Sequence, residues 1–215
     1  MLEHSGPLLV VMDVDSTVIE QEVIELIAAF AGVEPEVRSV TEAAMRGELD
    51  FTQSLRARVA LLTGLPASVL HDVRAQVTLT NGARELCATL KQRGDVIALV
   101  SGGFDVVVQH IAAELNVDHY LANRLEIADG HLTGRVSGAI VDRDRKAAAV
   151  REFAALHQIP MSRTVAVGDG ANDLDMMAAA ALGIAFNAKP VVQEHADVAI
   201  NVRDLRLVLD AISPR

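Results

Sequence analysis

The chain has 215 residues, of which 51% are hydrophobic and 3% aromatic, and its formal net charge is −10. This length and apolar content allow a substantial buried core and exclude a disordered chain. The acidic balance argues against non-specific binding to nucleic acid, which needs clustered Lys and Arg, and the aromatic residues are too few for base stacking.

The amino terminus and the apolar runs predict a cytoplasmic protein without membrane attachment. Residues 1–7 lack the basic start, the apolar stretch and the cleavage site of a signal peptide. The apolar runs are all shorter than the roughly 20 residues that a membrane helix needs. The one cysteine, Cys87, falls in a helical pattern where we expect a small buried side chain, which fits a reducing compartment.

Short apolar runs rich in β-branched residues alternate with helical patterns along the chain. Helical periodicity covers 104–115 and 146–156, and this alternation predicts an α/β fold with a doubly wound parallel sheet and a Rossmann-like core. A small β-hairpin excursion is predicted near 123–141 around the turn Asp129-Gly130. The runs that predict strands are 8–12, 96–100, 164–167, 183–186 and 198–202.

The segment from 18 to 80 is too long for a single crossover helix. Glycines at 32, 47 and 64 divide it into helical patterns over 20–30, 36–46, 51–63 and 67–76. An insertion directly after the first strand lies above the carboxyl edge of the sheet, so we predict a helical cap domain over 18–80. The catalytic core then comprises 1–17 and 81–215.

The first strand ends in two carboxylates, Asp13 and Asp15, separated by one residue. Open α/β sheets bind ligands at the carboxyl ends of their strands. Two acids this close repel each other unless a cation or a shared proton separates them, so a metal site is the functional interpretation. The alternative is a solvated turn or a helix cap.

The second strand runs into Ser101-Gly102-Gly103. Glycines let the backbone approach a ligand closely, a following helix start offers N–H groups, and Ser101 adds a hydroxyl donor, which together suit a phosphate. The alternative is an ordinary loop.

Lys146 lies in the first turn of its predicted helix on the line of Val150 and Phe153, which faces the core. The helix dipole disfavours a cation at this end, and a buried anion would compensate for both costs. The alternative is a lysine that extends to solvent along the apolar surface.

The third strand ends in Asp169, and Asp173 follows in the first turn of the next helix. Either acid could also be a turn or cap residue. Parallel strand ends open on one edge, however, so these groups can meet. Bound Mg²⁺ and a phosphoryl group would nearly balance their charges, and no Cys or His cluster has zinc spacing. The converging residues are Asp13, Asp15, Ser101, Lys146, Asp169 and Asp173.

The order of these motifs resembles the four motifs of the haloacid dehalogenase-like hydrolases, with Val14 where many members carry a larger residue. The resemblance is closest to members that hydrolyse phosphoserine in the last step of serine biosynthesis, and it runs from Leu8 to Leu209. It implies that Asp13 attacks phosphorus to form an aspartyl-phosphate and that Asp15 handles the leaving-group proton. The Mg²⁺ ligands it implies are Asp13, the Asp15 carbonyl and Asp169.

The same resemblance assigns the phosphoryl and substrate contacts. Ser101, Gly102 and Lys146 would stabilise the transferring group within the loop that includes Gly103. Asp173 would orient Lys146 or a metal-bound water. Asn172 would contact the phosphate or the substrate.

Selection of the small-molecule substrate is expected in the cap. Arg58 lies at the edge of the apolar stripe of its helix and suits the substrate carboxylate, in agreement with the resemblance. Helical periodicity from 20 onward places Glu22 on a solvated face, whereas the resemblance places it at the amine. Met45 and Phe51 would be apolar parts of the same lid.

Two rivals remain open. Another phosphatase of the family could act on a different small phosphorylated metabolite, since the core motifs do not choose the leaving group. A phospho-accepting receiver-type signalling module also gathers acids, a hydroxyl and a lysine, but it lacks the paired acids and the helical insertion. An inactive binding descendant would not need the full motif set, and no oligomeric state is predicted.

Overall fold

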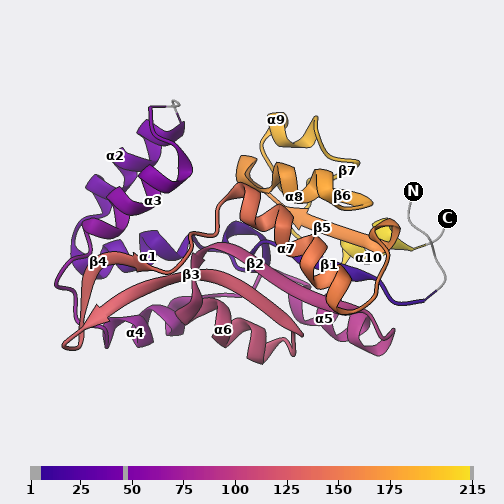
Figure 1. Cartoon of the computed structure of the whole chain (residues 1–215), viewed down its shortest axis with the longest axis horizontal. Helices are drawn as coiled ribbons and strands as arrows, with labels where there is room; N and C mark the ends of the chain where they lie inside the picture. The colour runs from indigo at the N-terminus through magenta and orange to yellow at the C-terminus, as the bar shows by residue number, and fades with distance from the viewer. Residues whose placement is uncertain (1–5, 46–47, 214–215) are drawn as a thin grey trace.

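The computed structural model describes residues 6–45 and 48–213, apart from the side chain of Met45. Within these residues a seven-stranded sheet has the order β4-β3-β2-β1-β5-β6-β7 and is parallel except between β3 and β4. Helices flank it, which confirms the doubly wound architecture (Figure 1). The strands are β1 (Leu9–Met12), β2 (Val96–Phe104), β3 (His119–Ala128), β4 (His131–Ser137), β5 (Thr164–Gly168), β6 (Leu182–Phe186) and β7 (Val198–Ile200).

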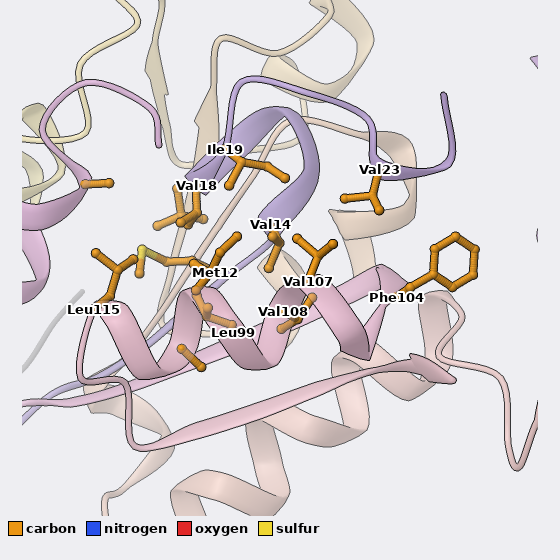
Figure 2. Packing of buried hydrophobic residues seen from close by; sticks show 14 of the residues in the cluster. Met12, Val14, Val18, Ile19, Val23, Leu99, Phe104, Val107, Val108 and Leu115 are labelled. Atoms are coloured by element: carbon orange, nitrogen blue, oxygen red, sulfur yellow. The ribbon is translucent and has the colours of Figure 1, made fainter. Parts of the chain in front are cut away.

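The central strand β1 is buried on both faces, as its unbroken apolar sequence predicts. Val10 and Met12 join the core that includes α5 (Ala83–Gln92), α6 (Asp105–Glu114) and α10 (Leu207–Ile212). Leu9 and Val11 join the core of α7 (Arg143–Leu156), α8 (Leu174–Ala179) and α9 (Pro190–Gln193). Figure 2 shows Met12 packed beside Leu99 of β2 over α6. Cys87 is buried and unpaired in α5, as expected.

Four helices follow β1 before the chain returns to the sheet: α1 (Val23–Ala31), α2 (Glu34–Met45), α3 (Phe51–Ala60) and α4 (Val69–Gln76). In Figure 1, α2 and α3 stand beside each other at the opposite end of the molecule from α5. The chain enters and leaves this insertion through paired segments, with Ile19 bridging Leu79 and Thr80 N–H donating to Val18 O at 2.9 Å. This pairing supports the proposal that 18–80 form a cap domain.

The first helix of the insertion begins at Val23, three residues later than predicted. The reason lies in the segment before it. Ile19 and Glu22 are extended, and the Val23 N–H is held by the Asp15 carboxylate at 3.1 Å. Glu22 therefore precedes the helix and does not lie on one of its faces.

The predicted hairpin is present, with Asp129 and Gly130 at positive φ of 48° and 74° in its turn. Its first strand is longer than predicted, because β3 also pairs in parallel with β2. The hairpin bonds to the insertion as well: Gly64 N–H donates to Leu132 O at 2.8 Å and Leu132 N–H to Leu65 O at 2.9 Å. It is thus a continuation of the main sheet that supports the connection between α3 and α4.

None of the helices in the described part of the chain combines the length and apolar content that crossing a bilayer requires.

Candidate functional site

A cavity of about 450 Å³ is bounded by the carboxyl ends of β1, β2 and β5 and by the helical insertion. Most of its polar lining carries charge, since acids from the strand ends meet arginines from α3 and α7. The residues that line it include Asp13, Asp15, Glu22, Ile24, Thr41, Leu49, Phe51, Arg58, Ser101, Gly102, Gly103, Arg143, Asp169 and Asn172.

Asp13 and Asp15 reach this cavity because the chain turns back immediately after β1. The Asp13 N–H donates to Val167 O at 2.9 Å, which continues the pairing with β5 for one more residue. The next five residues, Val14–Val18, form a kinked turn in which Asp15 is not helical and Ser16 adopts a φ of 58°. A serine at positive φ is uncommon, and this one directly follows the two acids that line the cavity.

Lys146 connects the carboxyl end of β1 to the start of α8. Its Nζ donates to Asp13 Oδ1, and it donates to Asp173 Oδ1 at 2.7 Å. Burial disfavours the ammonium, but the charges of Asp13 and Asp173 outweigh that cost and raise the pKa of Lys146. The core-facing position inferred from periodicity is confirmed, because Lys146 is fully buried.

The Asp13 carboxyl is surrounded by more negative than positive charge. Burial raises its pKa above the ordinary carboxyl value; Lys146 opposes this, while Asp173 and Asp169 add to it. A cation placed among these acids would remove the repulsion.

The Asp15 carboxyl has a different environment from its neighbour two residues before. One oxygen, Oδ2, accepts the Val23 N–H, whereas Oδ1 is buried and has no hydrogen-bond partner among the described residues. Burial, reinforced by the Glu22 charge, raises the pKa of Asp15 to about 8. A carboxyl that is protonated at neutral pH can donate a proton to a bound group.

Three acids could hold a metal ion. Asp13, Asp169 and Asp173 each offer one oxygen, and these atoms lie within 4.8 Å of one another. Thr17 Oγ1 donates to Asp169 Oδ1 at 3.2 Å, and burial together with Asp173 raises the pKa of Asp169 to about 7. An all-oxygen set of this charge suits Mg²⁺. The Asp15 carboxylate is not in this group, and the contribution of the Asp15 backbone carbonyl stays a prediction.

Ser101, Gly102 and Gly103 form part of the cavity wall, within a β2 that continues to Phe104. A Cβ on Gly102 would lie 2.8 Å from Phe51 Cζ, and one on Gly103 would lie 2.9 Å from Asp15 Oδ2. A side chain at either position would therefore force Phe51 or Asp15 to move. The predicted helix follows one residue later than expected, at Asp105.

The insertion brings two opposite charges, Glu22 and Arg58, to the cavity. Ser16 Oγ donates to Glu22 Oε1 at 2.6 Å, and the Arg58 guanidinium donates to Ser54 O at 3.3 Å. Periodicity placed Glu22 on a face of the helix, which is wrong because this residue precedes α1; its side chain is exposed, as predicted, and lines the cavity. Phe51 lies in the wall, whereas the side chain of Met45 lies outside the described residues.

The strand ends and helix starts bring the other predicted residues to the same place. Asn172 lines the cavity, and Asp173 is fully buried beside it, with its Oδ2 accepting the Gly170 N–H at 3.1 Å. The motif residues predicted to converge thus do so, except that Lys146 and Asp173 do not line the cavity; both are fully buried and bond to each other.

Sequence reasoning assigned no role to three residues of this site. Ser16 and Thr17 hold Glu22 and Asp169, and their position directly after the paired acids was the available signal. Arg143 lines the cavity and forms a two-bond ion pair with Asp175. It lies three residues before Lys146, so the same helical spacing could have identified it.

Comparisons with known proteins are consistent with this geometry. Residues 10–178 match the family model for haloacid dehalogenase-like hydrolase. The chain is 63% identical over 208 residues to phosphoserine phosphatase of Streptomyces coelicolor, an alignment that covers 97% of this chain and 51% of that protein. It is 47% identical over 204 residues to phosphoserine phosphatase of Lactococcus lactis, with 95% and 94% covered. The chain thus spans about half of the first relative and nearly all of the second.

Solved structures show the same similarity. A structure described as a phospho-aspartyl intermediate analogue of phosphoserine phosphatase has a TM-score of 0.92 and 45% identity, with 97% of this chain and 100% of that one covered. A substrate-bound phosphoserine phosphatase complex has a TM-score of 0.92 and 45% identity, with 98% and 100% covered.

Proposed function

The chain belongs to the haloacid dehalogenase-like hydrolase family, and from this membership we propose that it hydrolyses phosphoserine to serine and inorganic phosphate. One observation carries the choice of substrate. The cavity that the strand-end acids line, with the fully buried Lys146 bonded to Asp13, also presents Glu22 and Arg58. Phosphoserine has a phosphate, an ammonium and a carboxylate, which match these groups in charge.

In the first step the Asp13 carboxylate attacks phosphorus while the bond from phosphorus to the seryl oxygen breaks, which leaves an aspartyl-phosphate. Asp15 gives its proton to the leaving seryl oxygen. Its raised pKa supports this role, since a carboxyl of ordinary pKa holds no proton at neutral pH.

In the second step Asp15, now ionised, takes a proton from a water molecule that attacks the aspartyl-phosphate. The bond from phosphorus to the Asp13 oxygen breaks and inorganic phosphate forms. The buried Asp15 Oδ1 supports this step, because it has no protein donor among the described residues and belongs to a side chain that lines the cavity.

Asp13, the Asp15 backbone carbonyl and Asp169 would hold Mg²⁺, and the cluster of carboxylate oxygens fits an oxygen-seeking cation. When bound, this ion supplies positive charge that stabilises the transferring phosphoryl group and keeps the Asp13 carboxylate ionised. Asp173 holds Lys146 in place beside Asp13.

Lys146 and the Ser101–Gly103 loop would stabilise the charge on the equatorial phosphoryl oxygens. Gly102 and Gly103 would let the backbone approach those oxygens closely, because neither residue bears a side chain. Asn172 would contact the phosphate or the substrate from the α8 side.

Glu22 would accept the substrate ammonium and Arg58 would bind the carboxylate, with Phe51 and Met45 as the apolar lid. Ser16 supports this by holding the Glu22 carboxylate at the cavity. The activity is the last step of serine biosynthesis, and the buried thiol of Cys87 supports a reducing cytoplasmic setting.

A phosphate-release screen tests the proposal. The purified protein is assayed with phosphoserine, phosphothreonine, sugar phosphates and p-nitrophenyl phosphate, with Mg²⁺ and with excess chelator. We expect Mg²⁺-dependent turnover with the highest kcat/KM on phosphoserine. Preference for another metabolite would replace the substrate assignment, and a stable phosphoprotein without turnover would favour the receiver-type module.

A further inference from the structure

Asn123 is a fully buried polar residue whose side chain bonds to two segments of the site. Its Nδ2 donates to Gly102 O at 2.9 Å, and its Oδ1 accepts the Val141 N–H at 2.8 Å. Both partners are backbone groups, so the bonds depend on the path of the chain and not on a flexible side chain.

The bond to Gly102 compensates for a bulge in β2. Val100 is paired with Leu121, but the next pair is Phe104 with Asn123, so four steps along β2 match two along β3. Ser101–Gly103 therefore leave the regular ladder, and their buried backbone groups need other partners. The Asn123 side chain takes the place of the missing strand neighbour for the Gly102 carbonyl.

Both polar groups of one peptide in the bulge are held by hydrogen bonds. The carbonyl between Gly102 and Gly103 accepts from Asn123, and the N–H of the same peptide donates to Ser101 Oγ at 2.8 Å. In a trans peptide these two groups point in opposite directions, so the two bonds together set its orientation. The Ser101 hydroxyl accepts this bond and still has its own proton to donate to a bound group.

The second bond connects the bulge to the helix that carries Lys146. Val141 precedes Asp142, the residue that caps α7 by accepting the Arg145 N–H at 2.9 Å. Lys146 lies in the first turn beyond this cap. Asn123 thus spans from the Ser101–Gly103 bulge to the start of α7.

We propose that Asn123 is a positioning residue that holds the bulge and the start of α7 in the geometry that binds a phosphoryl group. The inference rests on the proposed function and extends it to a residue that does not contact the substrate. The side chain must donate at one end and accept at the other. An aspartate of the same shape keeps the acceptor but loses the donor.

The test measures inhibition constants for orthovanadate and inorganic phosphate on Mg²⁺-loaded wild type, Asn123→Asp and Asn123→Ala. An inhibition constant does not depend on how much of the enzyme is folded, so a purely structural defect does not move it. We expect both constants to rise about tenfold or more, as for one weakened hydrogen bond to a charged ligand. The fold-loss in kcat/KM is expected to be equal for phosphoserine and p-nitrophenyl phosphate.

Thr164→Val is the matched control. Thr164 is fully buried and makes two hydrogen bonds, to Met161 O at 2.8 Å and from the Ala181 N–H at 3.1 Å. It begins β5, at the opposite edge of the parallel sheet from the cavity. We expect Thr164→Val to lower Tm while both inhibition constants stay within twofold of wild type.

Unchanged inhibition constants in a folded Asn123→Asp protein would overturn the inference. Loss of fold in both Asn123 variants would also overturn it, in favour of a purely structural role. A wild-type protein that neither hydrolyses phosphomonoesters nor binds vanadate would overturn the proposed function itself, which separates that failure from a failure at Asn123.

Discussion

The ammonium of Lys146 lies 2.7 Å from the carboxylate of Asp173, and both side chains are fully buried. The same ammonium contacts Asp13. An acid at the end of β1 and an acid at the start of α8 are thus joined through one cation, with Asp169 close to both. The site combines a structural ion pair with a local excess of negative charge, and each property can be tested separately.

Replacement of Lys146 by Met removes the cation and leaves two buried acids uncompensated. We expect the free energy of unfolding to fall by about 3 to 5 kcal/mol at pH 8, as for other broken buried pairs. The pKa of Asp13 is higher in the folded protein than in the unfolded chain. The loss of stability is therefore largest above the folded pKa, where Asp13 is charged, and becomes smaller as pH falls towards the unfolded pKa and Asp13 takes up a proton. Urea unfolding without Mg²⁺ measures it. Arg151→Met, on the exposed side of the same helix, is the control. Equal stability of Lys146→Met and wild type at pH 8 would contradict this account.

Replacement of Asp13 by Asn removes the proposed nucleophile without changing its size. We expect phosphate release to fall by at least about 10³-fold, because an amide does not form the covalent intermediate. Burial already disfavours the charged form of Asp13, so the neutral amide keeps the fold, as circular dichroism and Tm can verify. Asp144→Asn on the exposed start of α7 is the control. Normal hydrolysis by Asp13→Asn would rule out the nucleophile assignment.

Replacement of Arg58 by Ala separates recognition of the seryl group from the chemistry. We expect kcat/KM for phosphoserine to fall by about 10² or more through the lost charged hydrogen bonds, with little change for p-nitrophenyl phosphate. Arg56→Ala lies two residues away on the same helix, is exposed, and should leave both substrates unaffected. Equal losses on both substrates in Arg58→Ala would make Arg58 a structural or general catalytic residue.

The pH dependence of kcat/KM should reveal the protonation state of Asp15. Its pKa of about 8 means that the proton donor is lost as pH rises above that value. We expect kcat/KM for phosphoserine to decline on the alkaline side, and much less for p-nitrophenyl phosphate, whose phenolate leaves without a proton. Glu22→Gln removes a charge that raises this pKa, so the alkaline limb should move to lower pH. Superimposable alkaline limbs for the two substrates would contradict proton donation by Asp15.

The Mg²⁺ dependence of phosphate release should test whether Asp169 binds the metal. Chelation of divalent ions should abolish phosphate release, and Asp169→Asn should raise the Mg²⁺ concentration for half-maximal activity at least about tenfold. Burial and Asp173 raise the pKa of Asp169 to about 7, so protons compete with the cation and the wild-type Mg²⁺ requirement should increase as pH falls below 7. Thr17→Val, which removes only the bond that orients Asp169, should have a smaller effect. An Mg²⁺ requirement unchanged in Asp169→Asn would remove this residue from the site.

Local sequence signals predicted the parts of the fold that depend on burial over short distances. The run that became β1 is apolar on both faces because helices cover both sides of the sheet. Lys146 was placed on a core-facing line by helical spacing alone, and it is buried. The paired acids, the glycine loop and the later acids could be brought together because parallel strands share a carboxyl edge.

The other parts of the fold and of the site depend on contacts between distant segments. Glu22 was misplaced because helical spacing was applied from residue 20, whereas the Asp15 carboxylate fixes the start of α1 at Val23. The first half of β3 carries His119 and Asn123 and has no apolar strand signal, so its pairing with β2 was not predicted. Asn123 has no local sequence signal for its role either, because that role follows from a bulge that only the sheet register reveals.

The hydrogen bonds between the β3–β4 hairpin and the connection after α3 make the insertion depend on the order of synthesis. Gly64 and Ala67 find their backbone partners in Leu132 and Gly130, far later in the chain. A nascent chain that ends before the hairpin leaves these groups to water, and the helix with Arg58 lacks its support. The insertion therefore reaches its final form only after the strand edge beside it exists, and its assembly is cooperative with that of the sheet.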